Sequence, residues 1–256
     1  MMGRSVDVDL RRDKVELASQ SFHRGLGLRA VVAGAVGFSS TSDFSLLEYV
    51  ARSAVQSARA RGRDESWVSL PLPERAVQPQ GVFDPRIAQM QPEQCLDLAA
   101  AMLSGCLAVS GAEPVSGGVT ALCGSDFVVN SLGVELTETS TLMNASLEAI
   151  ARSDGVATGS EFFNSRVSPA SVDEALAKVG RSAAEMACAS LGGTQAESGM
   201  ADVLLRPLAV AELLEYTLLP ALAADNVQKG RSSLRGRLGE IIAAPHLSIV
   251  DDGLLP

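Results

Sequence analysis

Runs of alternating polar and apolar residues open the chain. Apolar and charged residues alternate from Val6 to Leu10, and the pattern resumes from Val15 to Leu17 after a polar turn. Such alternation predicts an amphipathic β-hairpin. The glycine-rich segment 25–38 predicts two further strands around a turn at Ala33-Gly34. We therefore expect four antiparallel strands at the N-terminus.

Helical periodicity follows in separate segments. Apolar residues recur at spacings of three and four in residues 43–61, where Asp43 or Ser45 is available as the N-cap. The same spacing predicts helices over 92–109 and 171–191. A proline-rich stretch at 69–81 separates the first helix from the second and is typical of a linker.

A second alternating region lies at residues 117–144. The turn residues Asn130-Ser131-Leu132-Gly133 interrupt it, which favours a β-meander with the 171–191 helix packed on it. Further on, residues 202–208 are typical of a buried strand, and a helix begins near Pro207. The whole pattern predicts an α+β protein.

These elements suggest three parts of the chain. We predict an N-terminal αβ domain at residues 1–90, with an antiparallel sheet and helices, and a central β-rich domain with helices at 91–199. Residues 200–256 would begin a C-terminal β-rich domain that is incomplete.

Composition narrows the class of protein. Of the 256 residues, 46% are hydrophobic, which excludes a largely disordered chain, and the net charge of −9 argues against tight binding of nucleic acid. The N-terminus has no apolar signal-peptide core, and charges and prolines interrupt the apolar stretch 203–224, so we expect no membrane span. The four cysteines are scattered, which favours reduced thiols in a cytoplasmic protein.

Candidate catalytic residues are few. The only histidines are His23 and His246, and neither accompanies a nucleophile motif or a metal-binding spacing. Asp251-Asp252-Gly253 is foremost a turn signal. The basic stretch 229–237 lacks a phosphate-binding loop before it, so a solvated loop or a surface for an acidic partner or peptide carboxylate is the better interpretation.

Several short motifs resemble one known family. They lie in order along nearly the whole chain, at residues 21–29, 34–42, 129–135, 225–232, 238–240 and 251–253. Together they resemble the TldD/PmbA proteins, once described as modulators of DNA gyrase. The resemblance implies an αβ domain, a central β-rich domain and a C-terminal β domain. It also implies a TldD plus PmbA heterodimer that degrades peptides or unfolded proteins.

The TldD-type subunit of that family carries an HExxxH zinc motif, with a third ligand from a C-terminal cysteine. Aligned by its flanking residues, the motif falls on Glu215-Tyr-Thr-Leu-Leu-Pro220. Glu215 and Pro220 then occupy the two histidine positions, and Tyr216 occupies the position of the general base. The chain therefore resembles the PmbA side of the pair, for which we expect no metal site and no catalytic residue. We expect zinc only in a TldD-type partner.

Three hypotheses follow for function. The first is a PmbA-like, non-catalytic subunit of a TldD/PmbA-type metalloprotease complex, partnered by a TldD-like subunit. The second is a stand-alone homodimer that binds extended peptides by β-augmentation. The third is an active metallopeptidase with unusual ligands, Glu215 and His246 among them.

One loop is the first place to look for a substrate or partner contact. It contains Asn226, Gln228, Lys229, Arg231 and Ser232. Family members continue beyond the position that corresponds to Pro256, so we expect a short form or a fragment.

Overall fold

A computed structural model describes residues 1–65, 67–74, 77 and 79–255. These residues form two compact units, residues 1–193 with 253–255, and residues 194–252. Both helices and antiparallel strands are present, as the sequence predicts for an α+β protein. Residues 75, 76 and 78 of the predicted linker lie outside the described part of the chain.

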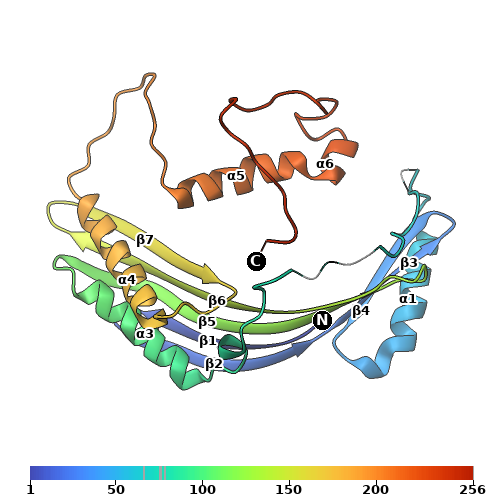
Figure 1. Ribbon diagram of the computed structural model, residues 1–256, viewed down its shortest axis with the longest axis horizontal. Helices are drawn as coiled ribbons and strands as arrows, with labels where there is room; N and C mark the ends of the chain where they lie inside the picture. The colour runs from blue at the N-terminus through green and yellow to red at the C-terminus, as the bar shows by residue number, and fades with distance from the viewer. Residues whose placement is uncertain (66, 75–76, 78, 256) are drawn as a thin grey trace. The chain divides into compact units, whose positions relative to one another are not determined.

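The first unit is built on a five-stranded antiparallel sheet with the strand order β2-β1-β5-β6-β7 (Figure 1). The predicted N-terminal hairpin forms from β1 (Met2–Arg11) and β2 (Lys14–Arg24). The meander predicted over residues 117–144 forms from β5 (Ala112–Val129) and β6 (Glu135–Arg152). A third strand, β7 (Val156–Ser165), extends it and was not predicted. β1 also pairs with β5, and the N-terminal hairpin thereby joins the central strands in one sheet.

A smaller sheet pairs β3 (Leu26–Val32) with β4 (Ala35–Thr41) around the predicted turn at Ala33-Gly34. Both turn residues have positive φ, 51° and 81°. Asp43 caps the 3₁₀ turn η1 (Phe44–Leu46), which leads into α1 (Leu47–Ala60). α1 approaches β4 so closely that a Cβ on Gly37 would lie 2.1 Å from the Ala54 carbonyl oxygen.

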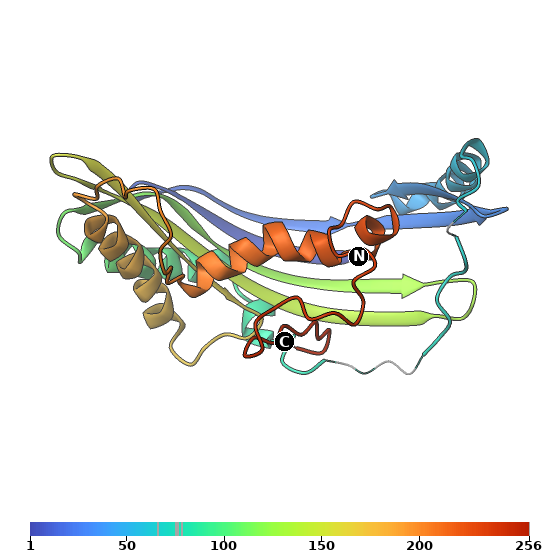
Figure 2. The same ribbon diagram turned by 90° about the horizontal axis from the view of Figure 1, so that it is seen from above.

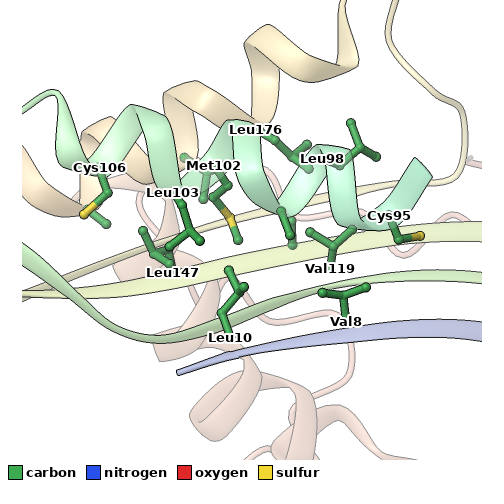
Figure 3. Close-up of a cluster of buried hydrophobic side chains, with 14 of the residues drawn as sticks. Val8, Leu10, Cys95, Leu98, Met102, Leu103, Cys106, Val119, Leu147 and Leu176 are labelled. Atoms are coloured by element: carbon green, nitrogen blue, oxygen red, sulfur yellow. The ribbon is translucent and has the colours of Figure 1, made fainter. Parts of the chain in front are cut away.

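Two helices cover one face of the large sheet, α3 (Pro92–Leu107) and α4 (Val172–Ala189) (Figures 1 and 2). Both form where the periodicity predicts them. Figure 3 shows side chains of α3 directed at the strands, with Cys95 near Val8 and Val119 and Leu103 near Leu147. Burial of such apolar side chains is the main stabilising contribution to folding.

Glycines bring α3 and α4 into backbone contact. A Cβ on Gly105 would lie 1.9 Å from the Ala177 carbonyl oxygen, and one on Gly180 would lie 1.9 Å from the Met102 carbonyl oxygen. α4 in turn lies close to β7, because a Cβ on Gly159 would lie 2.4 Å from the Ala183 carbonyl oxygen. This part of the core therefore depends on the absence of side chains.

The second unit contains α5 (Pro207–Leu222) and the short α6 (Ala224–Gln228). The helix predicted to begin near Pro207 is confirmed. The buried strand predicted over residues 202–208 is wrong: residues 201–206 have no regular structure, Leu204 is fully exposed, and Pro207 already begins the helix. Apolar side chains need a covering surface to form a buried strand, and none of the described strands pairs with this segment.

No helix in the described residues is both long and apolar enough to cross a membrane.

Candidate functional site

The position that resembles the zinc motif lies on α5. The helix begins with Pro207 at its first position, where the missing N–H has no intrahelical partner to lose. Glu215 and Tyr216 lie in the middle of the helix with exposed side chains, and Pro220 lies near its C-terminal end. The structure therefore places all three residues on one exposed helix.

These residues do not fit a zinc ion. A catalytic zinc needs three protein ligands with nitrogen, sulfur or oxygen donor atoms, and a proline side chain offers none. Among the described residues, no three or more His, Cys, Asp or Glu side chains gather in a way that could hold a metal. Neither Glu215 nor His246, the ligands suggested for an unusual metallopeptidase, belongs to such a group.

The loop after α5 folds back onto the end of that helix. The Asn226 side-chain amide donates to the Pro220 carbonyl oxygen at 2.7 Å, and the Ser232 hydroxyl donates to the Ala221 carbonyl oxygen at 2.6 Å. The last carbonyl groups of a helix have no intrahelical partner, so these bonds satisfy them. Asn226 and Ser232 thus fix the loop to the helix.

Charged residues of the same loop surround Asp225. Lys229 Nζ and Arg231 Nη2 each lie 2.5 Å from an Asp225 carboxylate oxygen. The hydrogen bond from Lys229, together with the charge of Arg231, lowers the pKa of Asp225. All three side chains are more than half exposed, so these ion pairs contribute little to stability.

The structure brings four of the five predicted loop residues together. Asn226 and Ser232 contact the end of α5, and Lys229 and Arg231 meet at Asp225. Gln228 ends α6 with an exposed side chain. The bonds from Asn226 and Ser232 to helix carbonyls were not predicted, because they require knowledge of where α5 ends.

Sequence reasoning also missed a buried polar cluster in the first unit, centred on Asp84. Its carboxylate, with the side chain 5% exposed, accepts hydrogen bonds from Arg86 Nη2 and the Ser168 N–H, both at 2.8 Å. The bond from the Arg86 side chain, assisted by backbone N–H groups, lowers the pKa of Asp84. The Asp84 N–H donates to Thr141 Oγ1 at 2.8 Å.

This cluster joins the end of the linker to β6 and to the loop before α4. Asp84 also caps α2 (Pro85–Ala88), since its Oδ1 accepts from the Arg86 N–H. An Asp directly before Pro at a helix start is an N-cap signal, and this signal in Asp84-Pro85 could have identified the cap. We interpret the cluster as structural.

A polar surface lies on the sheet face opposite α3 and α4. Because side chains alternate between the two faces of a strand, the residues next to buried Val8 and Val119 point away from the helices. Among them, Asp7 accepts hydrogen bonds from the hydroxyls of Ser5 and Thr120, at 2.8 and 2.9 Å. A shallow cavity of about 260 Å³ opens beside them. Its lining includes Asp9, Thr120, Asn144, Ser146 and Phe162.

This surface, which we call the polar sheet face, offers hydroxyl, amide and carboxylate groups. Such groups can exchange hydrogen bonds with a polar ligand such as a peptide backbone. The polar sheet face is therefore suited to binding.

Family models of a metallopeptidase-related class match three successive parts of the chain. Residues 2–59 match the family model for the PmbA/TldA metallopeptidase domain 1, residues 85–191 match the central domain, and residues 198–256 match the C-terminal domain. The chain belongs to the PmbA/TldD family, as the motif resemblance predicts.

Known proteins share the sequence or the fold. Protein MJ0231 of Methanocaldococcus jannaschii is 29% identical over 250 residues, which are 98% of this chain and 56% of that protein. A candidate DNA gyrase modulator of Thermotoga maritima, TM0727, is similar in structure with a TM-score of 0.80 at 19% identity, over 93% of this chain and 54% of that one.

TldE from Thermococcus kodakarensis has a TM-score of 0.76 at 18% identity, over 93% of this chain and 54% of its own. At these identities the structural likeness establishes the fold. The chain spans about half the length of the relatives it matches.

Proposed function

We propose that this chain is a PmbA-like, non-catalytic subunit of a TldD/PmbA-type metallopeptidase complex that degrades peptides or unfolded proteins. A TldD-like subunit would supply the zinc ion and the general base. This chain would bind peptide and complete the enclosed site.

The observation that carries the proposal is Pro220. It stands where the family's metal-bearing subunit has a zinc-ligating histidine, and a proline side chain cannot coordinate a metal. Tyr216 stands at the position of the general base and carries a phenol in place of the carboxylate that accepts a proton in that subunit.

The polar sheet face is the surface we propose for peptide contact in the first unit. It presents hydrogen-bonding groups over several strands, including Thr120 and Asn144 at the 260 Å³ cavity. In the second unit we propose that Gln228, Lys229 and Arg231 contact the partner or an acidic peptide. Their side chains are exposed, and Asn226 and Ser232 hold the loop in place.

Co-expression with a TldD-type protein from the same organism tests the proposal. We expect the two chains to co-purify and to cleave an unstructured peptide, with activity abolished by substitution of the partner's zinc motif. Reconstitution with Glu215→Ala in this chain serves as the control, and we expect it to leave the peptidase activity unchanged. A pair that never associates, or one whose activity depends on Glu215, would contradict the proposal.

A second candidate function is a stand-alone homodimer that captures extended peptides. It is favoured by the strand order, which leaves β2 and β7 at the two edges of the large sheet. An edge strand offers unpaired N–H and C=O groups to an added strand. Light scattering distinguishes the two candidate functions. The stand-alone function requires that this chain forms a homodimer and binds an unstructured peptide in the absence of a TldD-like partner.

We further propose that the protein works in the cytoplasm. All four cysteines are free thiols, and Cys95 and Cys106 are buried in the core of the first unit. Unpaired cysteines are typical of a reducing compartment.

A further inference from the structure

A cavity of the first unit lies at the end of the sheet where β1 turns into β2. It has a volume of about 700 Å³, within the range of small-molecule sites. Four parts of the chain line it: the β1–β2 turn, the end of α3, the start of β5 and the end of β6. None of its lining residues lines the 260 Å³ cavity of the polar sheet face or belongs to the loop of the second unit.

Three arginines line this cavity, in a protein of net charge −9. Arg11 pairs with Glu16 at 3.1 Å, and Arg152 pairs with Glu113 at 3.3 Å. Both pairs are largely exposed, and exposed pairs are worth at most about 1 kcal/mol, so an incoming anion can compete for these guanidinium groups.

Arg12 differs from the other two arginines. Within the described residues its side chain makes no hydrogen bond or ion pair, although Asp13 lies beside it in the lining. A guanidinium presents a planar fork of donors that matches a carboxylate or a phosphate. Arg12 is therefore available to bind an anion.

The backbone holds Arg12 in an uncommon conformation at the cavity. Its φ is 57°, in the left-handed region that non-glycine residues seldom adopt. Its N–H donates to the Val115 carbonyl oxygen at 2.8 Å, and the register between β5 and β6 shifts at that residue. Irregularities of this kind redirect side chains and occur often near binding sites. Together they fix the turn that carries Arg12.

An apolar surface completes the cavity. Leu107, at the end of α3, is 56% exposed there, and Val115 and Ile150 add further aliphatic surface. A site that combines a few charged groups with aliphatic walls suits a ligand that has both a charged and an apolar part.

We propose that this cavity binds a small anion, a carboxylate or a phosphate attached to an apolar group, with Arg12 and Arg152 on the anionic group. The apolar group lies against Leu107 and Ile150. This site is separate from the proposed peptidase role, so it can be tested on the chain without a partner.

Calorimetric titration with phenyl phosphate and with phenylacetate distinguishes the two anion types, and phenylacetamide serves as the neutral control. We expect one or both anions to bind and the amide not to bind. Arg12→Asn, which keeps a residue that tolerates positive φ, and Arg152→Gln should each weaken binding about tenfold or more. Arg59→Gln on α1 removes an exposed arginine far along the chain and should leave binding unchanged.

Three results would overturn the site: no binding of either anion up to about 10 mM, equal binding of the amide, or the same weakening in Arg59→Gln. Circular dichroism of each variant shows whether its fold is retained. If Arg12→Asn is unfolded, Arg152→Gln decides the question. Glu113, the ion-pair partner of Arg152, is exposed, so it stays hydrated after the arginine is removed.

Discussion

Replacing Gly105 by alanine tests how α3 and α4 are packed. In an exposed helix interior the change from glycine to alanine stabilises by about 1 kcal/mol. Here the added Cβ would lie 1.9 Å from the Ala177 carbonyl oxygen and 2.7 Å from its carbonyl carbon. These are backbone atoms, so relief requires the two helices to separate by about 1 Å or more, and forced overpacking costs about 1–3 kcal/mol or more.

The clash therefore outweighs the gain in helix propensity. Because neighbouring Met102 and Cys106 are fully buried, helix separation would also open the core beneath them. We expect a net loss of about 2 kcal/mol, which lowers the midpoint of thermal unfolding by about 4–8 °C for a domain of this size.

Thermal unfolding followed by circular dichroism measures the effect. Ser104→Ala is the matched control, because Ser104 precedes Gly105 on the same helix and is exposed. It should change stability by no more than about 0.5 kcal/mol. A Gly105→Ala protein as stable as the unchanged chain, or more stable, would refute the close contact between α3 and α4.

Three further predictions concern the buried carboxylate, the thiols and the end of α5. Asp84→Asn should cost about 2 kcal/mol, because it removes the charge that Arg86 and the Ser168 N–H contact. The pKa of Asp84 is lower in the folded state, so the stability that its charge contributes is present above the unfolded-state pKa and is lost as pH falls through the folded-state pKa. Chemical denaturation at pH 7 and pH 3 should therefore show a smaller difference in the free energy of unfolding between the two proteins at pH 3. An equal difference at both pH values would contradict the prediction. Burial raises the pKa of Cys95 to about 11. In the native protein at pH 8, alkylation followed by mass spectrometry should therefore modify the half-buried Cys123 and Cys188 well before Cys95. Equal alkylation rates would be inconsistent with the core position of Cys95. Asn226→Ala should increase amide hydrogen exchange in the last turn of α5, because the Pro220 carbonyl loses its donor. Gln228→Ala should leave this exchange unchanged. The same exchange rates in both variants would mean that the loop does not cap the helix.

Local patterns predicted the local elements well. The hairpin around residues 11–14 and the turn at Ala33-Gly34 follow from alternation and turn chemistry, and the helices α1, α3 and α4 follow from apolar spacing. Pairing of β1 with β5 was not predictable in this way. Val8 and Val119 are neighbours in the sheet but more than a hundred residues apart in the chain, and no local pattern encodes such a partner.

Burial in the second unit could not be predicted for a similar reason. The run from Val203 to Leu208 has the composition of a buried strand, but composition does not specify a covering surface. For the candidate site, the sequence likewise predicted one part and missed another. The residue types at 215, 216 and 220 argued against zinc, whereas the capping roles of Asn226 and Ser232 depend on where a helix ends in space.

The most direct test of the central claim is a joint measurement of zinc content and peptidase activity, made on the chain alone and on its complex with a TldD-type partner. We predict that the chain alone is inactive and binds no stoichiometric zinc, and that the complex is active with one zinc per pair, held by the partner. Stoichiometric zinc together with peptide cleavage in the isolated chain would contradict the claim.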